Sequence, residues 1–70
     1  MGLFDRYPCV KQVIVNTKSE KAFRGVLWKR TGEYLVLRNV QLLKPRGDVT
    51  DVDGEVMILA ANVDFIQVVG

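Results

Sequence analysis

The chain contains an almost uninterrupted apolar stretch, VMILAANVDFIQVV, which spans residues 56–69 and holds a single charge, Asp64. A membrane-spanning helix needs about 20 apolar residues, so this stretch of 14 residues is too short to cross a bilayer. A domain of 70 residues buries only about 60% of the surface that its unfolded chain exposes. The core of one copy therefore gives only thin stability, and a bare apolar strand edge is an aggregation hazard.

The composition excludes a disulfide and a zinc site, two features that commonly stabilise small domains. Cys9 is the only cysteine and histidine is absent, so the chain can form neither an internal disulfide nor a zinc site with the usual ligands. We therefore expect no metal and no cofactor, and the device that remains is association with other copies of the chain. Without histidine there is no ordinary imidazole base, so we also expect a protein that is not an enzyme.

The first ten residues, MGLFDRYPCV, lack the basic start and long apolar run of a signal peptide. We expect a cytoplasmic protein that does not contact a membrane. Within this segment, residues 3–7 predict a short helix that ends at Pro8, because proline cannot continue a helix.

Five segments have the composition of β-strands and are separated by turn residues. They are residues 10–16, 22–30, 34–43, 55–60 and 63–69, with tight turns at 31–33 and 61–62 and a loop at 44–54. Gly25 lies inside the second segment, where a glycine usually marks a bend or a close approach of two backbones. The pattern predicts a mainly β fold: a small, strongly bent five-stranded antiparallel barrel. We expect one domain over residues 1–70, with a helix or arm over 1–8 and the barrel over 9–70.

The last predicted strand has an apolar edge, which is hidden either by closure of the barrel or by another copy. Because the core is so small, we favour pairing with another copy. Repeated head-to-tail contacts between copies form a ring when the rotation closes. The residues expected at this subunit interface are Val56, Ile58, Ala60, Val63, Phe65, Ile66 and Val68.

Two stretches resemble the motifs of Sm and Sm-like proteins. The first is AFRGVLWKRTGEYLVLRNVQL, residues 22–42, with Gly25 followed two positions later by Leu27; the second is GEVMILAANVDFIQVV, residues 54–69. The resemblance implies a bent five-stranded barrel and rings of six or seven subunits, in which the fourth strand of one copy pairs with the fifth of the next. Other small barrels, such as SH3-like domains, share the same apolar pattern.

The resemblance also implies binding of single-stranded, uridine-rich RNA, but the pocket positions depart from the family pattern. Counted from Gly25, they hold Thr31, Glu33 and Leu35 in the first motif, and Leu59 and Ala60 in the second. Recognition of single strands depends on base stacking and a positive track, and these residues provide neither. We therefore expect an altered pocket.

The charges are unevenly distributed along the chain. Residues 22–46 contain six basic residues and one acidic residue, whereas residues 47–70 contain five acidic residues and no basic one. This asymmetry fits an anionic partner for the first part, or attraction between the two parts within or between copies. The candidate nucleic-acid contacts are Trp28, Lys29, Arg30, Thr31, Tyr34, Lys44 and Arg46.

Trp28 leaves two interpretations open. A tryptophan among cations is typical of a surface that binds nucleic acid. An aromatic side chain in a small domain also commonly packs, here against residues 3–4 or against another subunit.

The sequence as a whole leaves two hypotheses for function: a ring that binds single-stranded RNA as a scaffold or chaperone, or a structural or adaptor ring that binds no RNA.

Overall fold

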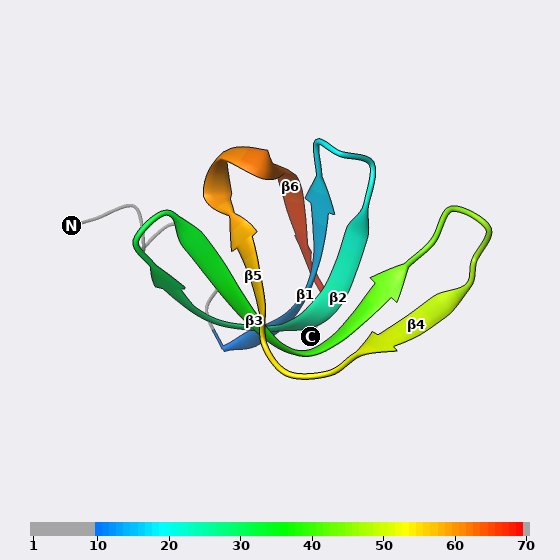
Figure 1. Ribbon diagram of the computed structural model, residues 1–70, viewed down its shortest axis with the longest axis horizontal. Coiled ribbons are helices and arrows are strands. Elements are labelled where there is room, and N and C mark those ends of the chain that lie inside the picture. The colour runs from blue at the N-terminus through cyan, green and yellow to red at the C-terminus, as the bar shows by residue number, and fades with distance from the viewer. Residues whose placement is uncertain (1–9, 70) are drawn as a thin grey trace.

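The computed structural model describes residues 10–69 and shows a strongly bent antiparallel sheet (Figure 1). Its elements, in chain order, are β1 (Lys11–Thr17), β2 (Ala22–Thr31), β3 (Tyr34–Leu43), β4 (Val49–Val52), β5 (Val56–Leu59), the 3-10 turn η2 (Ala60–Asn62) and β6 (Val63–Val68). The mainly β, bent antiparallel architecture is confirmed, with every predicted strand present. The helix or arm expected over residues 1–8, Cys9 and the packing of Trp28 on residues 3–4 lie outside the described residues.

The sheet order is β4-β3-β2-β1-β6, and β5 also pairs with β3. The two short strands β4 and β5 share one edge of β3, with β5 beside Tyr34–Leu37 and β4 beside Val40–Leu43. In Figure 1 the sheet forms an arch, η2 joins β5 to β6 at its top, and the β3–β4 hairpin projects to one side.

One prediction needs correction, because residues 44–54 are not all loop. The strand β4 forms inside this segment, since its β-branched residues pair with the second half of β3. The turn residues predicted there mark the two ends of β4: Gly47 and Gly54 have φ angles of 89° and 77°. The connection expected at 61–62 is likewise the three-residue turn η2.

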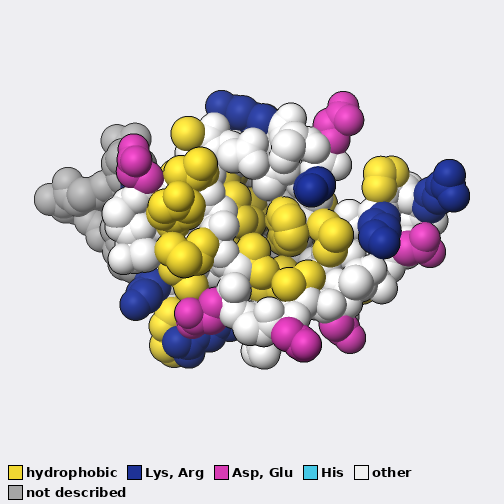
Figure 2. Space-filling view, in the orientation of Figure 1, with side chains coloured by type: hydrophobic (Ala, Val, Ile, Leu, Met, Phe, Trp, Pro, Cys, Tyr) yellow, Lys and Arg dark blue, Asp and Glu magenta, His cyan; other side chains and the backbone are white. Residues whose placement is uncertain are grey.

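The buried core lies on the inner side of the arch. It consists of Val13, Val15, Leu27, Leu35, Leu37, Val40 and Ile58, with Phe23, Val52, Val56, Val63 and Ile66 packed against it. Figure 2 shows hydrophobic side chains gathered in the hollow at the centre of this face. The apolar residues of β5 and β6 thus contribute to the core of their own chain.

The bend occurs where β2 crosses the middle of β3. A Cβ atom at Gly25 would lie 2.8 Å from the carbonyl oxygen of Arg38, so only glycine lets the two backbones come this close. The register between the strands shifts at this point, and Asn39 takes a positive φ of 54°. A second shift follows between Leu27 and Lys29, which places Trp28 in a β-bulge. The close approach predicted at Gly25 is confirmed.

Candidate subunit edges and nucleic-acid interface

Three strands of the described sheet, β4, β5 and β6, have one open edge each, and the predicted interface lies on β5 and β6. Within residues 10–69, β5 pairs only with β3 and β6 pairs only with β1. Both strands also expose large apolar side chains: Met57 and Leu59 on β5, and Phe65 and Val68 on β6. A bare apolar edge is a template for pairing with another chain.

The residues predicted for the subunit interface differ in their exposure to solvent. Phe65 and Val68 are exposed, whereas Val56, Ala60, Val63 and Ile66 are half-buried. Ile58 requires a correction, because it is only 5% exposed and belongs to the core of its own chain. The sequence analysis missed Met57 and Leu59; strict alternation along β5, with Val56 and Ile58 pointing inward, is the signal that identifies them.

The ends of the two motifs meet at the β2–β3 turn. Tyr34 is the cross-strand partner of Leu59, and the backbone N–H of Ala60 donates to the carbonyl oxygen of Glu33 over 2.8 Å. Thr31 pairs with Tyr34 across the turn. The structure therefore brings the candidate residues Thr31 and Tyr34 beside the second motif.

Leu35 does not belong to this surface. Its side chain is fully buried and pairs with Ile58 in the core, so it cannot line a pocket. A count of residues from Gly25 does not show which face of the sheet a side chain points to, since successive side chains of a strand point to opposite faces. Tyr34, which is exposed, is the residue of β3 that lies next to Leu59 at this end.

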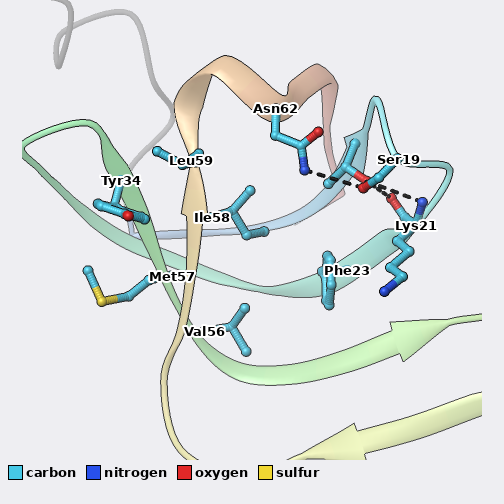
Figure 3. Close-up of a pocket in the computed structure, with 10 residues that line it drawn as sticks. Ser19, Lys21, Phe23, Tyr34, Val56, Met57, Ile58, Leu59 and Asn62 are labelled. Atoms are coloured by element: carbon cyan, nitrogen blue, oxygen red, sulfur yellow. Dashed lines mark hydrogen bonds between the residues drawn. The ribbon is translucent and has the colours of Figure 1, made fainter.

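The cavity beside β5 is shown in Figure 3. It has a volume of about 290 Å³, and its lining includes Phe23, Val56 and Ile58. At its polar rim, the side-chain amide of Asn62 donates to the Ser19 hydroxyl over 3.3 Å (Figure 3). The backbone N–H of Lys18 also donates to the carbonyl oxygen of Asn62, so the β1–β2 turn is fastened to η2.

Trp28 takes part in an ordered charge cluster on the surface. The guanidinium carbon of Arg38 lies 4.0 Å from the centre of the Trp28 ring, within the range of a cation–π contact. The Nε of Arg38 donates to the Glu55 carboxylate over 2.6 Å. This ion pair joins the basic and acidic parts of the sequence within one chain. Sequence reasoning missed Arg38 and Glu55, because their contacts depend on the bulge at Trp28 and on the pairing of β3 with β5.

The remaining candidate cations lie in two places. Lys29 is exposed beside Trp28, and the Nε of Arg30 donates to the carbonyl oxygen of Gly32 over 3.0 Å. Lys44 and Arg46 are exposed at the tip of the β3–β4 hairpin. The principal axes of the molecule measure 39 × 21 × 20 Å, and the β2–β3 turn and the hairpin tip lie at opposite ends of its long axis (Figure 1). One chain therefore does not combine all candidate contacts in a single site.

Two solved structures share this architecture. The first is a heptameric archaeal Sm protein, which is 27% identical over 87% of this chain and 88% of that chain, with a TM-score of 0.75. The second is the SmAP1 heptamer of P. aerophilum, also 27% identical, over 87% of this chain and 81% of that chain, with a TM-score of 0.75. No protein-family model matches the chain, and no curated protein matches it.

The bent antiparallel sheet of this chain has the fold of the two Sm proteins. Over most of its length the chain is similar in fold and sequence to these archaeal Sm proteins, which supports the resemblance to the Sm-like family. No helix among residues 10–69 is long and apolar enough to cross a membrane.

Proposed function

We propose that this chain assembles with copies of itself into a closed ring of six or seven subunits. The observation that supports the ring is the pair of open edges, since β5 and β6 each have one unpaired side within the described sheet. The two edges belong to different strands, so pairing β5 of one copy with β6 of the next is a head-to-tail contact that repeats. The similar solved structures are themselves heptamers.

The exposed side chains suit this pairing. Phe65 on β6 would pack against Met57 and Leu59 on β5 of the next copy, which removes exposed apolar surface from both edges. In the isolated chain Phe65 is 52% exposed, so its main contribution is to assembly and not to the fold of one copy.

The substitution Phe65→Asp tests the ring. It places a charge in the strand pairing, so we expect monomers that keep the far-ultraviolet circular dichroism of a folded sheet. The matched control is Val49→Asp on β4, because Val49 is equally exposed, at 53%, and lies on the hairpin. Light scattering should give a wild-type mass of six or seven times 7.9 kDa, and the same mass for the control. A Phe65→Asp protein that keeps the full mass would refute this interface.

We propose further that the ring is a non-enzymatic scaffold or chaperone that binds single-stranded RNA through basic and aromatic surface residues. The support is the exposed Trp28, Lys29 and Tyr34 near the β2–β3 turn, together with the hairpin cations Lys44 and Arg46. A ring repeats each weak contact in every subunit, so the contacts combine through multivalency. The altered pocket residues Glu33 and Leu59 predict binding with little preference for uridine.

The same altered positions favour a second candidate function, a structural or adaptor ring that binds no RNA. Leu59 and Ala60 offer no cation at the β2–β3 end, and Glu33 repels phosphate. Anisotropy titrations of labelled oligo-U and oligo-A at several salt concentrations separate the two functions. Steeply salt-dependent binding of both oligonucleotides supports the RNA-binding ring. The absence of binding at low salt leaves the structural ring.

A further inference from the structure

Trp28, Arg38 and Glu55 form an ordered surface cluster, which we call the Trp–Arg stack. The guanidinium of Arg38 lies over the Trp28 ring at 4.0 Å, while Glu55 holds the Arg38 Nε at 2.6 Å. These contacts fix the plane of a side chain that is otherwise among the most mobile. The side chains of Arg38 and Glu55 are nevertheless 45% and 49% exposed, so the stack is open to solvent.

The backbone builds this arrangement through the bulge in β2. Leu27 pairs with Leu37 and Lys29 pairs with Val36, so Trp28 has no cross-strand partner of its own. A bulge redirects the side chain that it carries, and here the indole meets Arg38 on the neighbouring strand. Such bulges are more frequent next to functional sites than elsewhere in sheets.

The Arg38 guanidinium in the stack still has N–H groups that can donate hydrogen bonds to a ligand. Among residues 10–69 the Arg38 side chain makes its ring contact with Trp28 and its ion pair with Glu55, and its two Nη nitrogens have no hydrogen-bond partner there. The contact with Glu55 joins two exposed groups, and exposed ion pairs contribute little to stability. Stability alone therefore does not account for an arginine held over an exposed tryptophan.

We propose that the Trp–Arg stack holds one unpaired nucleobase of single-stranded RNA, a proposal that rests on the RNA binding proposed above. The base lies on the guanidinium face turned away from Trp28, because guanidinium planes and aromatic rings are the surfaces on which proteins stack bases. The two Nη groups donate to acceptors on the edge of that base. Glu55 offsets the charge of Arg38, which favours stacking over attraction to phosphate, and the adjacent exposed Lys29 faces the backbone charge. Stacking of this kind tolerates any base.

The protein contains its own reporter for this site, since Trp28 is its only tryptophan. Adding unlabelled oligo-U or oligo-A of about ten nucleotides, within the usual range of single-strand site sizes, should change the Trp28 fluorescence. The change should follow the same binding curve as the anisotropy of labelled oligonucleotide.

Arg38→Gln is the variant that removes the stacking plane, and Arg24→Gln is its matched control. Both residues are exposed arginines on the β2–β3 pair, and both substitutions remove one positive charge. We expect Arg38→Gln to weaken binding of both oligonucleotides about tenfold, as the loss of one base–protein stack does. Arg24→Gln should weaken binding only about twofold, as expected for one distant phosphate attraction.

Each outcome has a distinct meaning. Equal losses of affinity for the two variants, in proteins with the circular dichroism and ring mass of wild type, would overturn the stack and leave general electrostatic binding. Binding detected by anisotropy without any change in Trp28 fluorescence would also overturn the stack, while the proposed RNA function stands. No binding of either oligonucleotide would overturn both.

Discussion

The two halves of β3 have opposite environments, although they belong to one continuous strand. Tyr34–Leu37 pairs with β5 and contains three buried residues, whereas Val40–Leu43 pairs with β4 and is mostly half-buried. The strand that covers the second half, β4, is itself almost entirely exposed. The first half thus lies in the bent body of the sheet, and the second half in a projecting hairpin (Figure 1).

The difference separates the part that defines the fold from the part that is free to vary. The first half of β3 places Leu35 and Leu37 in the core with Leu27 and Ile58, where a change of even one methylene group affects packing. The hairpin pairs its backbone in the same way but buries little beyond Val40. Its side chains can therefore change with less effect on the body of the sheet.

The largest effect on the free energy of unfolding is expected from truncating a leucine in the first half of β3. Leu37→Ala should lower the free energy of unfolding by about 2–5 kcal/mol, because Leu37 is fully buried and its truncation leaves a cavity. Leu42→Ala is the matched change in the second half, where truncating the half-buried side chain should cost only about 1 kcal/mol. Urea unfolding at equal protein concentration measures both, since assembly makes the apparent stability depend on concentration. Equal decreases in stability would show that the hairpin contributes as much as the body.

An intermediate effect on the free energy of unfolding is expected where the two halves of β3 meet. Gly25 lies against Arg38 and Val40, so Gly25→Ala forces a Cβ atom to within 2.8 Å of a carbonyl oxygen. We expect the free energy of unfolding to fall by about 1–3 kcal/mol, the usual range for an overpacked site. Gly47→Ala in the hairpin turn meets no atom within 4 Å, but its φ of +89° should still cost about 1 kcal/mol.

Thermal melting monitored by circular dichroism compares the two glycine variants. A Gly25→Ala protein with the same melting temperature as the wild type would contradict the close approach of β2 and β3. It would also remove the reason for placing the bend of the sheet at that residue.

The sequence predicted the first half of β3 better than the second, for a physical reason. Alternation and turn residues identified every strand of the body, and Gly25 indicated the bend, because these signals are local. The strand β4 was missed, since Pro45, Gly47 and its aspartates resemble a loop until pairing with β3 is known. The contact of Trp28 with Arg38 depends on a one-residue bulge that composition does not reveal, and the contact of Arg38 with Glu55 depends on the pairing of β3 with β5. Counting from Gly25 assigned Leu35 to a pocket although it is a core residue, because a count along the sequence does not show which face of β3 a side chain is on.

The smallest effect on stability is expected at the hairpin tip, where only RNA binding should change. The double substitution Lys44→Gln and Arg46→Gln should shift the free energy of unfolding by less than about 0.5 kcal/mol, because both side chains are exposed. The tip should keep its shape, since the backbone N–H groups of Lys44 and Gly47 donate to the carbonyl oxygens of Asp48 and Lys44, both over 2.9 Å.

If both cations bind phosphate, the logarithm of oligonucleotide affinity should fall less steeply with the logarithm of salt concentration. The slope should decrease by about 0.7 for each phosphate that is no longer neutralised. The matched control is Lys11→Gln with Lys18→Gln, which removes the same charge from exposed positions on the β1 side of the molecule. The control should change the slope less than the hairpin variant. Equal slopes for the two variants would mean that the hairpin cations act only through net charge, and the projecting half of β3 would then have no specific part in binding.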